Sequence, residues 1–576
     1  MRHAPLRRPM RVFSLVYVAC QVLIAGGFAQ AQQMPDAGSL LREQTKPAIP
    51  PAPPRTIAVP SADGLAPSKP AEGARILVKG FRILHATLFT QELLQAQLRD
   101  LVDKELDFGE LQQASERLAG YYQQHGYLAH VFFPAQTVQG GVVEIEVVEG
   151  VAGEILLEGE SQRLDKARIK RFVDYQQALG APIQLEHIAT VVAILNEQPG
   201  LGVKASLKPG SKDGLTDLVI QIGERPLLSY NLQTNNQGSE GTGELQLGGN
   251  LSLNNPTGLF DLGALTFNKS DGSDYVRGEY TLAVGNTGLR LGLNASELNY
   301  KITQSSLSAL QSHGEASTLG LAALYPLLRR DTLNLSLSAN LDQKAMVDKT
   351  VAGEIGNKRV NVTNLGLAGM GTDSLWGGGN TGFGMNFISG NVDLGHNAGA
   401  LAADQSARQT QGNYEKLAFN LSRRQAVGPG LEVNASLTGQ VVDKNLDSSE
   451  RFTLGGPTGI RAYPIGEATG DEGWLAKFIT SYTVSQQLTA SAFVESGYVK
   501  LNKNTWTVWN SSNPTLPNEY GLTGAGLSLD WKIGAATLTV VLATPLGSNP
   551  GADSQGKDAD GQHRDVRGWV SLSAPF

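Results

Sequence analysis

The chain has 576 residues, of which 41% are apolar, and its formal net charge at pH 7 is −7. This length suits several domains, and the apolar fraction excludes a chain that is disordered throughout. Beyond the N-terminus no apolar run is long enough for a membrane helix, so a membrane span would have to be a β-barrel. An acidic chain of this kind is also a poor nucleic-acid binder.

The first 31 residues have the order of a secretory signal peptide. Four arginines come first, an apolar run covers 12–28, and the triplet Ala29-Gln30-Ala31 precedes expected cleavage before Gln32. Their removal leaves 43 basic and 54 acidic residues, a net charge of −11. A lipoprotein anchor would use Cys20, but the Tyr-Val-Ala before it is a poor lipobox. Cys20 is the only cysteine, so the mature chain is expected to have none, as suits an oxidising periplasm.

A short helix and a proline-rich linker are expected next. Residues 35–44, PDAGSLLREQ, favour a short helix within the segment 32–45. The density of prolines in the linker 46–73 favours extended, unpacked chain. A disordered N-terminal tail is the alternative.

Residues 74–150 and 151–225 are predicted to form two small α+β domains, each with the element order β-α-α-β-β. In the second, apolar residues recur at helical spacing along 185–195 before a Pro-Gly stop. Two generic small domains are the plainer interpretation. Their tandem position directly ahead of a barrel-like region speaks against it.

From residue 226 to residue 576, short segments alternate apolar residues with polar residues or glycine, as the strands of a transmembrane barrel do. We count sixteen such segments, among them 258–270 and 376–390. Connections after even-numbered segments are short, whereas most after odd-numbered segments are long, which is how barrels distribute periplasmic turns and surface loops. A soluble β-sandwich or propeller is the alternative. The alternation into the terminal Phe576 resembles a barrel assembly signal and favours the barrel.

Two motifs in this region carry the candidate functional residues. The sixth long connection contains RFTLGGPTGIRAY, residues 451–463, with Arg461 in a glycine-rich stretch. An unpaired charge in a low-dielectric surrounding costs several kcal/mol, so Arg461 is expected to have an acidic partner or to face water. Two strands further on, FVESG at 493–497 offers the carboxylate of Glu495.

These motifs resemble the signatures of the ShlB/FhaC/HecB family, the outer-membrane transporters of two-partner secretion. The first is similar to the VRGF/Y signature of the sixth loop, with Ala462 where glycine is more frequent. The second is similar to the FxDxG element of the barrel wall, with Glu495 in place of aspartate. The resemblance implies that Arg461 pairs with Glu495 inside the lumen. It is further carried by Gly455, Gly456, Ile460, Tyr463, Phe493 and Gly497.

The resemblance implies a mainly β fold: a 16-stranded barrel at 226–576, two periplasmic POTRA domains at 74–150 and 151–225, and a plug helix at 32–45. It also implies a pore that recognises a large exoprotein of the adhesin or haemolysin type in the periplasm and secretes it without ATP. The partners would be this exoprotein, the barrel assembly machinery that reads Phe576, and outer-membrane lipids. An assembly factor that inserts other barrels and a nutrient pore or receptor are the alternatives.

Patterns for catalysis are largely missing. The eight histidines are scattered and no HExxH occurs. The segment GADSQGKD, residues 551–558, nearly spells a phosphate-binding loop, but Asp558 stands where Ser or Thr would hold Mg²⁺. We therefore expect no enzymatic activity, no metal and no cofactor.

Overall fold

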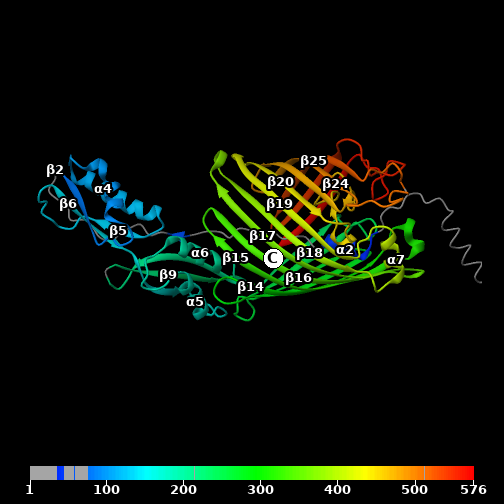
Figure 1. Ribbon diagram of the computed structural model, residues 1–576, viewed down its shortest axis with the longest axis horizontal. Helices are drawn as coiled ribbons and strands as arrows, with labels where there is room; N and C mark the ends of the chain where they lie inside the picture. The colour runs from blue at the N-terminus through cyan, green and yellow to red at the C-terminus, as the bar shows by residue number, and fades with distance from the viewer. Residues whose placement is uncertain (1–34, 45–56, 59–74, 213, 512, 576) are drawn as a thin grey trace, which may run out of the picture.

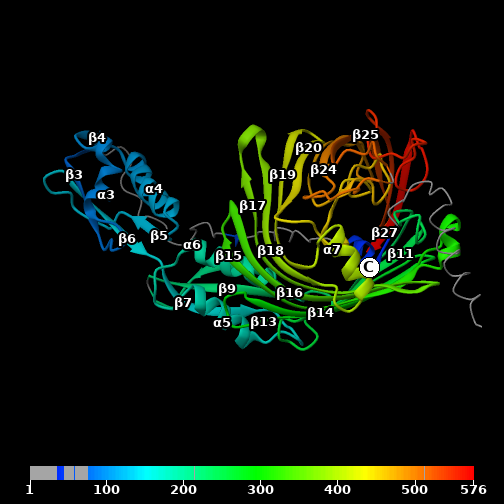
Figure 2. The ribbon, with the colours of Figure 1, turned by 45° about the vertical axis from the view of Figure 1, so that its right-hand side comes forward.

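The computed structural model describes residues 35–44, 57–58, 75–212, 214–511 and 513–575. Two small α+β units lie beyond one end of a large barrel, and a short helix lies inside the barrel (Figures 1 and 2). Among the described residues, no helix is both long enough and apolar enough to cross a membrane. The predicted signal peptide at 1–31, Cys20 and Phe576 fall outside the described residues.

The first unit packs helices against two small sheets. Its strands β3 and β6 are parallel, and β5 runs antiparallel to β6. Asp107 caps the long helix with a reciprocal capping box to Glu110. The elements are β2 Ile76–Val78, β3 Gly80–Leu84, α3 Gln91–Ala96, η1 Arg99–Leu101, β4 Lys104–Leu106, α4 Phe108–Gln124, β5 Ala129–Phe132 and β6 Val142–Glu149.

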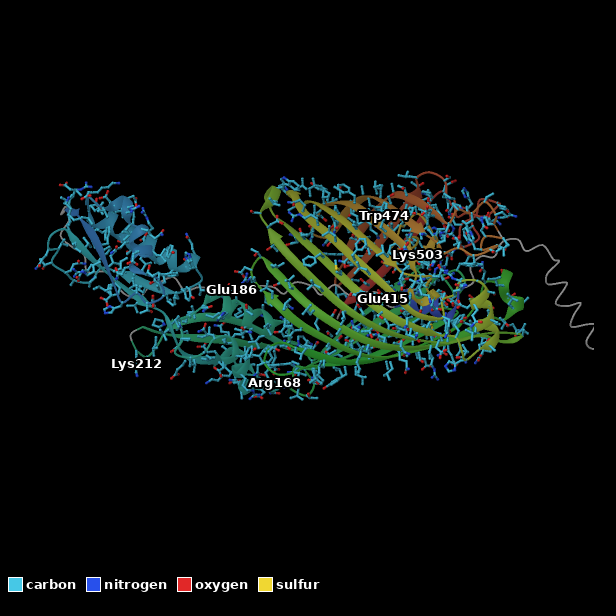
Figure 3. The ribbon with its side chains drawn as sticks, in the orientation of Figure 1. Arg168, Glu186, Lys212, Glu415, Trp474 and Lys503 are labelled. Carbon is cyan, nitrogen blue, oxygen red and sulfur yellow. The ribbon has the colours of Figure 1, made fainter. Side chains whose placement is uncertain are left out.

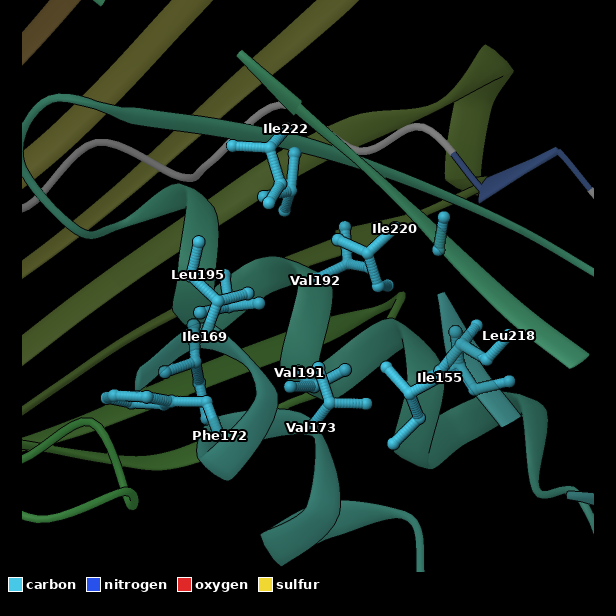
Figure 4. Packing of buried hydrophobic residues seen from close by; sticks show 14 of the residues in the cluster. Ile155, Ile169, Phe172, Val173, Val191, Val192, Leu195, Leu218, Ile220 and Ile222 are labelled. Atoms are coloured by element: carbon cyan, nitrogen blue, oxygen red, sulfur yellow. The ribbon is translucent and has the colours of Figure 1, made fainter. Parts of the chain in front are cut away.

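The second unit repeats the β-α-α-β-β order. Its elements are β7 Val151–Glu158, α5 Lys166–Gln176, α6 Leu185–Asn196, β8 Leu201–Pro209 and β9 Leu215–Glu224. Branched apolar residues of both helices meet the sheet in one core (Figure 4). The linker, expected to be unpacked, contributes the two-residue strand β1, Ile57–Ala58, which pairs in parallel with β8.

Sixteen antiparallel strands form the closed barrel in the described part of the chain, and β10 pairs with β27 to close it. This confirms the predicted fold class. The strands are β10 Leu228–Asn235, β11 Gln246–Asn254, β12 Leu262–Lys269, β13 Ser273–Ala283, β14 Arg290–Lys301, β15 His313–Arg329, β16 Leu333–Thr350, β17 Gly353–Asp373, β18 Gly379–Asp393, β19 Gly412–Gly428, β20 Leu431–Val442, β23 Glu472–Thr483, β24 Leu488–Lys500, β25 Glu519–Ile533, β26 Ala536–Pro545 and β27 Arg567–Pro575.

Several strand predictions begin a few residues too early, and two of these have a clear structural cause. The segment 258–270 forms a strand only from Leu262, because residues 255–261 make a turn that packs against the second unit. The segment 376–390 forms a strand only from Gly379, because Trp376 lies in a left-handed turn at φ 50°. In both places an apolar residue ahead of the strand fits the apolar–polar alternation and made the predicted strand too long.

The loops hold the remaining elements. These are η2 Ser305–Leu310, η3 Leu375–Gly377, α7 Ala398–Ser406, η4 Ser448–Glu450, β21 Phe452–Thr453 and β22 Thr469–Gly470. The last three belong to the connection 443–471 between β20 and β23, hereafter loop 6. Along β14, Leu291 and Leu293 are exposed on the outer face while Asn294 and Ser296 are buried on the lumen side. The strands therefore present apolar residues to lipid and polar residues to the interior.

Candidate functional site

Loop 6 folds into the barrel and places its tip, residues 455–463, against the wall formed by β24, β25 and β27. The Nε atom of Arg461 donates to Oε1 of Glu495 over 2.8 Å, and the backbone N–H of Arg461 donates to Oε2 over 2.7 Å. The Glu495 side chain is completely buried. A carboxylate that accepts two bonds from one residue fixes both the position and the orientation of the tip.

Aromatic residues enclose this ion pair. The guanidinium of Arg461 lies 3.4 Å from the ring centroid of Phe493, a cation–π contact. Trp569 on β27 donates its indole N–H to the carbonyl of Arg461 over 2.8 Å. Lys477 lies 3.6 Å from Glu495 and binds the carbonyl of Thr458. The tip is thus held to three strands at once.

Glycines allow the tip to approach the wall this closely. A Cβ atom on Gly497 would lie 2.5 Å from a methyl of Leu454, and one on Gly524 would lie 2.6 Å from the Cβ of Ala462. Gly456 has φ +109°, a conformation that side chains with a Cβ rarely adopt. Ala462 stands where the family signature more often has glycine, and its methyl group fits here because Gly524 has no side chain.

The base of loop 6 binds the opposite part of the wall. The carboxylate of Glu450 pairs with two lysines of the wall: Nζ of Lys344 on β16 lies 2.6 Å from Oε1, and Nζ of Lys416 on β19 lies 2.7 Å from Oε2. Burial raises the pKa of Glu450, but these two lysines outweigh it and lower the pKa to about 2. Asp447 receives Lys358 of β17 at 2.7 Å. The loop therefore spans the lumen between two anchored ends.

Helix α2, Ala37–Gln44, lies inside the lumen between the base of loop 6 and the wall (Figure 2). Lys358, which holds Asp447, also contacts Asp36 at 3.4 Å. The N–H of Ala37 donates to Asp348 over 2.8 Å. A Cβ on Gly38 would meet Ser448 at 2.4 Å, so the helix backbone lies directly on loop 6. Lys358 therefore binds both loop 6 and the residue directly before the helix.

A second loop closes over the tip from outside. Glu467 of loop 6 accepts the N–H of Ala559 over 2.7 Å and the amide of Asn549 over 3.1 Å, both from the connection 546–566. Burial raises the pKa of Glu467 to about 7, and the nearby Asp558 adds to this. The phosphate-loop-like segment 551–558 therefore lies between two residues, Asn549 and Ala559, that bind loop 6.

The second α+β unit is docked on three short barrel turns, 255–261, 284–289 and 330–332, which we call the seat. Phe260 is fully buried in the core of that unit, edge-on to Phe172 at 5.8 Å between ring centroids. Arg168, labelled in Figure 3, stands 5.2 Å from the Phe260 ring. Arg329, only 6% exposed, makes a two-bond pair with Glu197 at 2.5 and 3.1 Å. These contacts fix the unit against the barrel end.

Comparison with known proteins connects this geometry with a family. The family model described as haemolysin secretion/activation protein ShlB/FhaC/HecB matches residues 214–525, more than half of the chain. The chain belongs to this family. The model of the ShlB-type POTRA domain matches residues 76–150, so the first unit is a POTRA domain.

Relatives agree over most of the length. The heme/hemopexin transporter protein HuxB of Haemophilus influenzae strain Rd is 27% identical over 90% of this chain and 93% of its own. The outer membrane transporter CdiB of Dickeya dadantii is 23% identical over 70% and 71%. The fold of CdiB from Escherichia coli matches with a TM-score of 0.69 at 19% identity over 98% of both chains. That of CdiB from Acinetobacter baumannii matches with 0.60 at 15% over 98% and 97%.

As a member of this family the protein is a two-partner secretion transporter of the outer membrane that secretes an exoprotein partner, with its POTRA region in the periplasm. The predicted family and function are thus confirmed, and the alternatives are not favoured. Members of this family are transporters or secretion pores and are not known as enzymes. Within the described ranges no group of three or more His, Cys, Asp or Glu side chains is placed to hold a metal ion.

The structure brings most of the motif residues together. Arg461, Glu495, Phe493 and Gly497 meet at the tip, and Ile460 and Tyr463 are buried beside them. Gly455 and Gly456 lie in the bend that returns the chain toward Tyr463. Sequence reasoning missed the wall lysines that hold the base of the loop, Phe260 of the seat, Arg329 at the end of β15, and the shared role of Lys358. A lysine at a lumen position of an alternating strand was the available signal.

Proposed function

We propose that the protein exports one large exoprotein of the adhesin or haemolysin type through the barrel lumen, with loop 6 held by Arg461 and Glu495 and with α2 as a removable plug. The observation that carries this proposal is the fully buried Glu495 bound to the loop tip in a lumen that a short helix also occupies. A removable occupant is needed because a barrel of this strand number is wide enough for an aqueous channel.

Its domain boundaries in this proposal are a signal peptide at 1–31, a plug segment at 32–45, a linker at 46–73, POTRA domains at 74–150 and 151–225, and the barrel at 226–576. The POTRA domains recognise the unfolded cargo by adding it as a strand to an exposed sheet edge. Parallel pairing of Ile57–Ala58 with β8 supports strand addition, because it occupies such an edge within this chain.

The protein is not an enzyme in this proposal and uses no cofactor or metal. The periplasm holds no ATP, so folding of the cargo outside biases its passage. The barrel assembly machinery inserts the chain by reading the end that contains Phe576, and outer-membrane lipids surround the exposed leucines of the strands. The outward placement of Leu291 and Leu293 supports the lipid contact.

The test is secretion of the partner exoprotein by cells that carry the full chain or a variant lacking residues 75–224. We expect the exoprotein outside the cell with the full chain and only periplasmic fragments with the variant. Levels of other outer-membrane proteins should stay unchanged in both. If deletion of the whole gene lowers those levels while secretion persists, the protein acts as an assembly factor and the proposal is wrong.

A further inference from the structure

The turn between β17 and β18 exposes two large apolar side chains. Trp376 is 85% exposed, the highest fraction among the large apolar residues that the structure describes, and Leu375 is 61% exposed. Trp376 has φ 50° and ψ 39°, the left-handed region that favours glycine and asparagine. A strained backbone that holds a tryptophan this exposed suggests that the side chain has a binding partner.

The turn is held firmly in this conformation. The side-chain amide nitrogen of Gln425 on β19 lies within hydrogen-bonding distance of the carbonyls of Leu375, Trp376 and Gly378, at 3.2, 3.1 and 2.8 Å. Gln425 itself is buried. Arg423, also on β19, binds Asp373 at the start of the turn with both terminal nitrogens. The exposure of Trp376 is therefore a property of a fixed structure.

The contacts of the turn show that it folds back onto the outside of the barrel. On β19 the side chains of Tyr414 and Lys416 face the lumen and are buried. Leu421, which is 49% exposed, faces outward, and Arg423 and Gln425 follow it at the next two outward positions. Because the turn packs on Gln425, it lies just beyond the point where the outer apolar surface gives way to charge. It lies at the end of the barrel that carries the POTRA units (Figure 1).

Other exposed aromatic residues lie near the strand ends on this side of the barrel. Five exposed aromatic side chains lie within four residues of the end of a strand on the side of the POTRA units: Tyr230, Tyr280, Tyr325, Tyr482 and Trp531. Tyrosine and tryptophan collect where apolar lipid meets water, because their rings are apolar and their polar atoms stay hydrated. Trp376 lies in the turn between β17 and β18 on the same side of the barrel.

We propose that Leu375 and Trp376 insert into the boundary between headgroups and acyl chains in the periplasmic leaflet and bind phospholipid there. The outward fold of the turn favours lipid over cargo, since a cargo segment in the lumen does not reach the outer face of β19. The charged pair of Asp373 and Arg423 lies at headgroup depth, and the rigid turn sets how deeply the barrel sits on this side.

The test places a spin label at Leu375→Cys in full-length protein with Cys20→Ser, in phospholipid vesicles, and measures accessibility to oxygen and to a water-soluble nickel chelate. Leu421→Cys is the reference in the bilayer, and Lys212→Cys, far from the barrel in Figure 3, is the reference in water. We expect an oxygen-to-nickel ratio at 375 severalfold above that at 212 and approaching that at 421. A ratio equal to that at 212 overturns the proposal.

Tryptophan emission gives a measurement that leaves the turn intact. Brominated phospholipid should quench a component of the wild-type emission that is missing in Trp376→Phe, while emission of both proteins is otherwise alike. Absence of that component overturns the proposal. So does a label at 375 that is in water in empty vesicles and loses mobility only when exoprotein is added, because the turn would then bind cargo.

Discussion

Replacing Arg461 with alanine should release the tip of loop 6 without unfolding the barrel. The substitution leaves the fully buried carboxylate of Glu495 without its main partner. Removing one member of a buried ion pair costs about 3–5 kcal/mol. The backbone N–H of residue 461 still donates to the carboxylate and Lys477 remains 3.6 Å from it, so the lower end of this range, about 3 kcal/mol, is expected.

A loss of about 3 kcal/mol raises the open fraction of the tip about 100-fold, because each 1.4 kcal/mol is a factor of about ten. Hydrogen exchange reports such local opening. The amides of Ile460 and Arg461 donate to Leu454 and Glu495 in the closed loop, so peptides covering 454–463 should lose about 100-fold protection. Secretion should fall strongly while the amount of barrel in the membrane stays near normal.

The matched control is Arg424→Ala, which removes an exposed arginine that pairs with Glu432 at 2.6 Å. Exposed pairs contribute about 0–1 kcal/mol, so exchange at 454–463 and secretion should stay unchanged. The double variant of Arg461→Ala with Glu495→Gln should lose less than the sum of the single variants. Unaltered protection in Arg461→Ala, or strict additivity in the cycle, would refute the view that this pair closes the loop.

Three further predictions concern other parts of the molecule. Deleting residues 32–45 should raise single-channel conductance in planar bilayers and antibiotic uptake with only a modest loss of secretion, and unchanged conductance would mean that α2 does not obstruct the pore. Arg329→Gln should broaden the spin-label distances between the second α+β unit and the barrel, because it breaks an ion pair whose arginine is only 6% exposed. Arg330→Gln breaks an exposed pair and should not broaden them, and equal broadening would contradict this reasoning. The pKa of Glu467 is raised from its usual 4.5 to about 7, so the neutral form favours the folded contact: the stabilisation is full below about pH 4.5 and is lost as the pH rises through about 7. Amide exchange at 556–562, corrected for its intrinsic pH dependence, should therefore quicken between pH 6 and pH 8, and Glu467→Gln should abolish that change; a wild-type profile that is flat would argue against it.

The sequence predicts the strands well because apolar and polar residues alternate along each strand, one set on each of its two faces. Leu291 and Asn294 on β14 illustrate this, since lipid and water select different residues at neighbouring positions. The tip of loop 6 was predictable for a different reason: residues 460–463 and 493–497 resemble the family's loop and wall signatures, and that resemblance implied the pair of Arg461 and Glu495.

Contacts between distant segments were not predictable in the same way. Lys358 looks like any polar residue of the lumen face, and nothing local shows that it binds Asp447 and Asp36 at once. Phe260 and Trp376 fit the apolar alternation of the strands that follow them, so the pattern placed both in strands. Only the packing of the second POTRA unit and of β19 shows that both belong to turns.

The seat also links two folding events. Phe260 belongs to the hairpin of β11 and β12, yet it is fully buried in the core of the second POTRA unit. That unit precedes the barrel in the chain. Until the barrel hairpin forms, the place beside Phe172 that Phe260 fills in the core of the unit is therefore vacant. Burial of a phenylalanine contributes about 1.5–3 kcal/mol, which is gained only once the hairpin has formed. Formation of this hairpin therefore completes the core of the domain that precedes it in the chain.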